Sequence, residues 1–189
     1  MNKVKLDDIA EVQTGMSYRR YLAELGKEYE VIVQRSIQRD GILKDFEKIK
    51  FDPINIKPHH LTRPGDVLMK MPYPYDVVCV SQPDLVISDR IAIIRLKEGY
   101  DPSFIAHLLT NTHIKKQLYE FESMERIPHV SIKQIKEIEL LVPDYETQIR
   151  YGRLLDTINE KIAEDLKLVK YDQDLKEGIL NELWGDLNE

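Results

Sequence analysis

The stretch after Pro143 constrains this chain most. The fixed φ of Pro143 disfavours helix in the residue before it, so an extended segment must end there. Asp144 can then cap a helix, with Thr147 and Gln148 near the position where a capping box places its return partner. No further proline follows. A helix over about 145–183 would be roughly 60 Å long, which is more than a compact domain needs.

Apolar residues form a stripe along this predicted helix. Their spacing of mostly three or four residues keeps them on one face, and it is closer to an eleven-residue repeat than to a strict heptad, so we expect little supercoil. The simpler alternative is an amphipathic helix that lies on its own domain. One small domain cannot cover so long a stripe, so we expect a second helix from another chain. The predicted dimerisation residues are Leu155, Ile158, Ile162, Leu166, Val169, Leu175, Ile179 and Leu183.

Length and composition predict one globular domain with an appendage. The chain has 189 residues, of which 42% are hydrophobic and 32% charged, which is typical of a soluble folded protein. No apolar run approaches the roughly 18 residues that span a bilayer, and the first residues lack the apolar core of a secretory signal. Cys79 is the single cysteine, so no disulfide framework is possible. We therefore expect a cytoplasmic protein.

The formal charge of −6 is unevenly distributed. Residues 144–189 carry 6 basic residues (Lys and Arg) against 12 acidic ones (Asp and Glu), which leaves 21 basic and 21 acidic residues in 1–143. The acidic surplus therefore belongs to the predicted helix. Because nucleic-acid binding depends largely on neutralising phosphates with Lys and Arg, any such binding must come from residues 1–143.

The remaining pattern predicts an α+β domain with mainly antiparallel, mixed sheets and packed helices. We expect strands at 29–37, 67–71, 77–80, 85–96 (one central strand or a hairpin) and 138–142, with helices starting at Asp101 and Thr112 and a short one capped by Ser131. Residues 51–64 are expected to form a loop. On extended backbone the neighbours His59 and His60 would face opposite sides, which argues against a shared metal.

Two segments carry side chains suited to nucleic acid. Arg19 and Arg20 lie between two tyrosines after Gly15, and arginine forks bind phosphates or guanine while aromatic faces stack on bases. Tyr73 and Tyr75 lie on a tip stiffened by two prolines, with Lys70 at its edge. Each segment has a plain structural alternative: the arginines can be ordinary surface residues, and the tyrosines can cover the domain's own core.

Four passages, taken in order, resemble the specificity (S) subunits of type I restriction–modification systems. The first, 6–15, is similar to the opening strand-and-glycine segment of the family. The second, 61–68, resembles the Gly-Asp-hydrophobic start of a central strand, and the third, from Pro128 to Pro143, resembles the closing loop and strand. The most specific is 142–149, which is similar to the Pro-x-x-x-x-Gln start of the spacer helix.

The resemblance implies a DNA target-recognition domain, 1–143, followed by a spacer and dimerisation helix, 144–189. It implies a subunit without catalytic activity or cofactor, since methylation, S-adenosylmethionine binding and cleavage belong to partner methyltransferase (M) and restriction (R) subunits. Family members usually hold two such units in one chain with antiparallel helices, whereas this sequence has one. It therefore resembles a half-subunit that pairs with itself, or with another half-subunit, as an antiparallel coiled coil on a bipartite site in double-stranded DNA.

The sequence gives little support to an enzyme class. Neither an Asn/Asp-Pro-Pro-aromatic loop nor a glycine-rich phosphate loop occurs, and a nuclease-like pairing of Asp144 with Asp165 would separate the carboxylates by about 30 Å on one helix. A coiled-coil-tethered module that binds protein rather than DNA stays open, because the domain has no net charge. The sequence also leaves open the target bases, the half-site spacing and the surface that binds the M subunit. It equally leaves open whether the chain is a natural half-subunit or a fragment of a two-domain chain. By residue type and loop position, the predicted DNA contacts are Arg19, Arg20, Lys70, Tyr73, Tyr75, Arg126 and His129.

Overall fold

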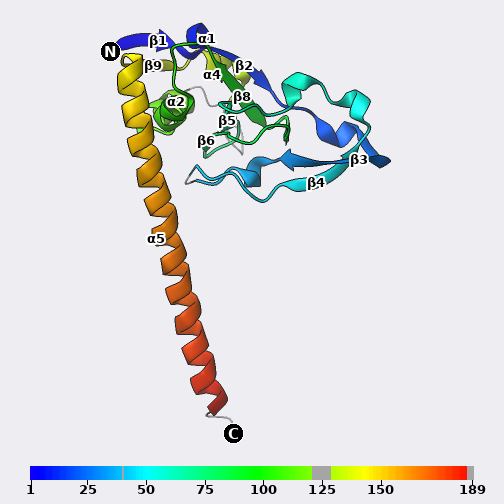
Figure 1. Ribbon diagram of the computed structural model, residues 1–189, viewed down its shortest axis with the longest axis vertical. Coiled ribbons are helices and arrows are strands. Elements are labelled where there is room, and N and C mark those ends of the chain that lie inside the picture. Colours follow the sequence, from blue (N-terminus) through cyan, green and yellow to red (C-terminus); the bar gives the residue numbers. More distant parts are fainter. Residues whose placement is uncertain (40, 121–128, 187–189) are drawn as a thin grey trace. The chain divides into compact units, whose positions relative to one another are not determined.

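The computed structural model describes residues 1–39, 41–120 and 129–186. Contacts divide the chain into two units, Met1–Leu155 and Asp156–Glu189. The predicted long helix is confirmed as α5 (Tyr145–Asp186), one continuous element whose first turns belong to the first unit (Figure 1). The α+β class is also confirmed. Within the described ranges, no helix has both the length and the apolar character that crossing a bilayer requires.

Among the described residues, the strands of the first unit form three sheets. The largest is antiparallel with the order β2 (Ala10–Thr14), β8 (Ile91–Leu96), β5 (Val67–Lys70) and β6 (Val77–Cys79). The second has the order β4 (Glu47–Phe51), β3 (Leu22–Ile32) and β7 (Val86–Ile87), with β3 and β7 parallel. The third pairs β1 (Asn2–Lys5) with β9 (Glu139–Val142), antiparallel.

The central strands β5 and β8 are buried on both faces. Successive residues of a strand point to opposite sides, so Met69 and Ile94 face one hydrophobic cluster while Leu68 and Ile93 face another. This double burial explains why these segments read as almost continuous apolar runs. A third cluster, which includes Met16 and residues of β3, β4 and β7, lies beneath the second sheet.

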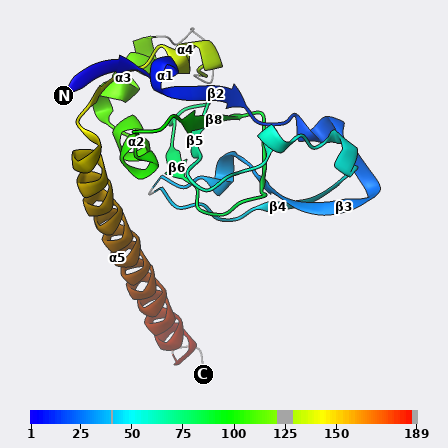
Figure 2. The ribbon, with the colours of Figure 1, turned by 45° about the horizontal axis from the view of Figure 1, so that its top comes forward.

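Short helices cover one side of the large sheet. They are α1 (Leu6–Ile9), α2 (Pro102–Leu109), α3 (Thr112–Glu120) and α4 (Ile132–Lys136), and α2 packs beside β5 and β6 (Figure 2). The predicted caps are confirmed: Asp101 accepts from the Phe104 backbone N–H at 2.8 Å, and Ser131 forms a capping box with Gln134.

The two longest predicted strands differ from the structure. The segment 29–37 was predicted as one strand, but β3 ends at Ile32 and a single 3₁₀ turn, Gln34–Ser36, follows. The segment 85–96 was predicted as one strand or a hairpin, whereas it forms β7 and β8 in two different sheets. The prediction for 29–37 was wrong because the polar triplet Gln34-Arg35-Ser36 forms a turn between apolar residues and does not continue the strand. The prediction for 85–96 was wrong because a buried apolar run looks the same whether it stays in one sheet or crosses to another.

The loop at 51–64 is also more ordered than predicted. It starts with the end of β4 and contains the 3₁₀ turn Pro58–His60, so His59 and His60 are not on extended backbone and do not face opposite sides. Their rings lie edge to face with centroids 4.2 Å apart. Burial, and then the neighbouring His59, lowers the pKa of His60 below its ordinary value. Across the described ranges, no group of three or more His, Cys, Asp and Glu side chains could hold a metal ion.

The first turns of α5 are locked into the first unit. Asp144 caps the helix as predicted, accepting from the Thr147 backbone N–H at 2.9 Å, and this hydrogen bond lowers the pKa of its carboxyl group. Gln148 is 2% exposed and accepts from the Asp101 backbone N–H at 3.0 Å. It also donates to the carbonyl of Pro143 at 2.9 Å. These contacts explain why the division into units falls after Leu155 rather than at Pro143.

Two glycines of α5 should respond oppositely to alanine. A Cβ on Gly152 would lie 2.7 Å from Asp101 Oδ1 and 3.2 Å from the Phe104 backbone nitrogen, which would disturb the cap of α2. A Cβ on Gly178 meets no atom within 4 Å. We expect Gly152→Ala to lower the free energy of unfolding by about 1–2 kcal/mol, and Gly178→Ala to stabilise the helix by up to about 1 kcal/mol. Thermal unfolding followed by far-UV circular dichroism tests both, and equal effects would contradict the packing at Gly152.

Candidate nucleic-acid interface

A pocket of about 1000 Å³ lies where the chain passes between the two larger sheets. Its walls come from the segment after β2, the turn that follows β3, and the turn that joins β7 to β8, with Pro72 and His129 at one side. Most of the lining residues therefore lie in segments that follow or join strands of the two sheets. Its lining residues are Ser17, Tyr18, Arg19, Arg20, Val33, Gln34, Arg35, Glu47, Pro72, Ser88, Asp89, Arg90 and His129.

Gly15 allows the segment after β2 to pass close to the backbone at the end of β7. A Cβ at this position would lie 2.2 Å from the carbonyl oxygen of Ile87 and 2.4 Å from that of Ser88, so no other residue fits without moving backbone. The next residue, Met16, donates its backbone N–H to the Ile87 carbonyl at 2.6 Å. This contact brings the segment Ser17–Arg20 against the turn between β7 and β8.

That turn, Ser88–Arg90, is held by backbone on both sides. The Asp89 N–H donates to the Met16 carbonyl at 3.1 Å, and the Arg90 carbonyl accepts from the Met71 N–H at 3.1 Å. The Arg90 N–H also donates to Ser88 Oγ at 3.3 Å. The turn is thus fixed between the segments that follow β2 and β5.

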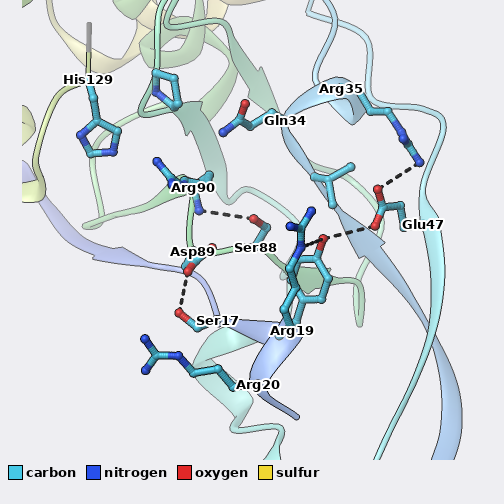
Figure 3. Close-up of a pocket in the computed structure, with 13 residues that line it drawn as sticks. Ser17, Arg19, Arg20, Gln34, Arg35, Glu47, Ser88, Asp89, Arg90 and His129 are labelled. Carbon is cyan, nitrogen blue, oxygen red and sulfur yellow. Dashed lines mark hydrogen bonds and ion pairs between the residues drawn. The ribbon is translucent and has the colours of Figure 1, made fainter. Parts of the chain in front are cut away.

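The pocket carries an excess of positive charge. Four arginines face two carboxylates, those of Glu47 and Asp89, although the whole domain is neutral. Both carboxylates are already engaged: Glu47 pairs with Arg35 at 3.0 Å, and Asp89 accepts from Ser17 Oγ at 2.5 Å (Figure 3). The net charge of residues 1–143 therefore hides a local cationic surface.

The arginines fall into two groups. Arg35 is held by Glu47, and Arg19 lies over the ring of buried Tyr18, 5.8 Å from its centroid, with a hydrogen bond to the Tyr18 hydroxyl at 3.5 Å. That hydrogen bond raises the already high pKa of Arg19, so its charge is permanent. By contrast, the exposed guanidinium groups of Arg20 and Arg90 pair with no carboxylate among the described residues. They are available to an anionic or acceptor-rich ligand.

The structure brings together three of the residues predicted from sequence. Arg19, Arg20 and His129 all line the pocket, although His129 is distant from the arginines in the chain. An isolated β-bridge between Pro72 and His129 places the histidine there. Tyr73 follows Pro72, is 52% exposed, and lies edge to face with Tyr75, their ring centroids 5.9 Å apart.

The other predicted contacts have different environments. Tyr75 is fully buried in the main core, so it covers the domain's own core and is not exposed to stack on a base. Lys70 Nζ lies 2.9 Å from the Asp76 carboxylate, and both side chains are largely buried, so its charge is already paired. Arg126 lies outside the described residues.

Sequence reasoning missed Gln34, Arg35 and Arg90. Arg35 and Gln34 belong to the segment that was predicted to continue a strand, and Arg90 to the predicted strand 85–96. One signal was present: Ser88-Asp89-Arg90 is a polar triplet that interrupts an otherwise apolar run, which is typical of a turn.

The second unit presents the predicted stripe to solvent. Seven of the eight predicted dimerisation residues lie in it, and their side chains are 45–63% exposed. Leu155, the eighth, is the last residue of the first unit and is half-buried. Leucine, isoleucine and valine in a row along one helix face form an unusually extended exposed apolar surface, which is typical of an interaction site.

No family model matches this sequence, and no curated protein is similar to it in sequence. Solved structures are similar in fold. The HsdS subunit from Thermoanaerobacter tengcongensis superposes with a TM-score of 0.68 at 18% identity, over 88% of this chain and 44% of that one. The type I restriction–modification S subunit from M. genitalium superposes with a TM-score of 0.59 at 14% identity, over 93% of this chain and 43% of that one.

A third similar chain comes from a structure that describes complex assembly and conformational transition of the type I R-M system. Its TM-score is 0.64 at 18% identity, over 86% of this chain and 39% of that one. The fold that the sequence motifs implied is thereby confirmed: the chain has the fold of type I specificity subunits. It spans less than half the length of each of these solved chains, as one domain-plus-helix unit would.

Proposed function

We propose that this chain is a non-catalytic DNA specificity subunit of a type I restriction–modification complex, and that it acts as a half-subunit. The observation that carries the proposal is the fold match, which covers about nine-tenths of this chain but only about four-tenths of the solved specificity subunits. Residues 1–143 would recognise one half of a bipartite site in double-stranded DNA. The helix would set the distance to the second half.

The pocket at the sheet junction supports DNA as the ligand. Arginine binds phosphate and guanine through forked hydrogen bonds, and two of the four arginines have no carboxylate partner among the described residues. Arg19 and Arg35 are already oriented by Tyr18 and Glu47, so less side-chain entropy is lost when they bind. In this proposal Arg19, Arg20 and Arg35 contact phosphates, and His129 and exposed Tyr73 contact bases or sugars.

The exposed stripe supports self-association. A second copy that packs antiparallel along Asp156–Leu183 would cover the seven exposed apolar residues and place one recognition domain at each end. A two-fold dimer of this kind reads an inverted repeat with a fixed gap. In the complex, the methyltransferase (M) and restriction (R) subunits would supply methylation and cleavage.

DNA binding is tested by titrating salt. If Arg20 contacts a phosphate, Arg20→Ala should weaken binding to all sequences about equally and reduce the slope of log affinity against log salt concentration by about one per chain bound. Fluorescence anisotropy with a labelled duplex, with the partner M subunit present, measures both quantities.

Lys97→Ala is the matched control. It removes one positive charge just after the far end of β8, about 20 Å along the strand from Arg90, and should leave the slope unchanged. Absence of binding to any duplex would reject DNA recognition and favour a protein-interaction module. Binding whose strength does not depend on salt would reject the arginine contacts.

A further inference from the structure

The pocket contains one arginine whose position differs from the others. Arg90 is the last residue of the turn between β7 and β8, and Figure 3 shows its side chain between those of His129 and Ser88 in the pocket. Arg35 is paired with Glu47, and Arg19 is held on Tyr18. Arg20 and Arg90 both pair with no carboxylate among the described residues, and the neighbouring Asp89 is engaged by Ser17 at 2.5 Å. What distinguishes Arg90 from Arg20 is its place on the turn that joins two sheets.

The backbone of Arg90 is fixed on both sides. Its N–H donates to Ser88 Oγ, its carbonyl accepts from the Met71 N–H, and the next N–H, that of Ile91, donates to the Ser88 carbonyl at 3.1 Å. Ile91 itself is fully buried and begins the central strand β8. An exposed, uncommitted side chain on a rigid base is what base reading requires, because a misplaced fork loses one of its two hydrogen bonds.

Resting on the proposed function, we infer that Arg90 is a specificity-determining residue that reads a guanine. Its guanidinium donates two hydrogen bonds to O6 and N7 of the base in the major groove. Adenine is rejected because it presents the N6 amino group where guanine presents the O6 acceptor, so donor would face donor. The other three pocket arginines act on phosphates, which fixes position without reading sequence.

The test is selection from a library of randomised DNA duplexes, with the partner M subunit present, by the full chain, its Arg90→Ala and Arg90→Lys variants, and the Arg20→Ala control. The unmodified chain should enrich a motif with guanine at one position of each half-site. Arg90→Ala should accept all four bases there, with the preference for guanine falling roughly ten- to hundred-fold, while the other positions stay selected. Arg90→Lys keeps the charge but not the fork, so it should also lose the preference.

Arg20→Ala should weaken binding without changing the motif. Because Arg90 is exposed, its variants should unfold at the temperature of the parent chain, which thermal melting verifies. If Arg90→Ala weakens all sequences equally, or leaves the motif unchanged, the inference is wrong although DNA recognition stands. If the unmodified chain enriches no sequence, the proposed function fails together with it.

Discussion

Asp66→Ala is expected to lower the free energy of unfolding by about 3–5 kcal/mol. Asp66 is 3% exposed and receives a two-pronged contact from Arg95, at 2.9 Å from Nε and 3.1 Å from Nη2. Removing the carboxylate would leave the Arg95 guanidinium, on a side chain only 13% exposed, with the Leu61 carbonyl as its remaining acceptor among the described residues. Chemical denaturation measured by fluorescence gives the change.

Two further variants show whether the cost comes from an unpaired buried charge. Glu139→Ala removes one partner of the exposed Lys3–Glu139 pair and should change stability by no more than about 0.5 kcal/mol. Adding Arg95→Met to Asp66→Ala removes the stranded charge and should recover part of the loss. A cost for Asp66→Ala no larger than that for Glu139→Ala would contradict the ion pair at the start of β5.

Ile162→Asp should separate the proposed dimer. Ile162 is 45% exposed in the single chain, and pairing would bury it against a second helix. A two-fold dimer would then bury two unpaired carboxylates, so we expect self-association to weaken by roughly 1,000-fold or more. Light scattering across a concentration series should show the unmodified chain at twice its 22.2 kDa mass and the variant at the single mass.

Lys167→Asp is the matched control for Ile162→Asp. Lys167 is exposed and lies on the polar face of α5, since no predicted dimerisation residue is three or four residues away from it. This variant places the same carboxylate on the same helix, outside the stripe, and should stay dimeric. Loss of the dimer in both variants would indicate general disruption of the helix, and a monomeric unmodified chain would overturn the half-subunit.

Local signals allowed the helices to be predicted well. Asp101, Ser131 and Asp144 are each followed by residues that complete a cap, and all three cap a helix in the structure. The motif residues behind the family resemblance turn out to be structural. Gly15 permits a close crossing, Asp66 pairs with Arg95, and Gln148 ties α5 to the start of α2.

The sheet topology and the full pocket could not be predicted in the same way. Whether β7 and β8 belong to one sheet depends on long-range pairing, which an apolar run does not encode. Arg90 was therefore placed inside a strand, although it lies in the turn that brings two sheets together. Lys70 and Tyr75 were chosen by residue type, and only the packing shows that one is paired and the other buried.

Selection of duplexes from a randomised library by the unmodified full chain, with the partner M subunit present, tests the central claim most directly, because it reports recognition and symmetry together. The proposal predicts enrichment of an inverted repeat: two identical half-sites in opposite orientation, separated by a gap of fixed length and free sequence. A single half-site without a partner would contradict the paired arrangement, and enrichment of no sequence would contradict DNA recognition itself.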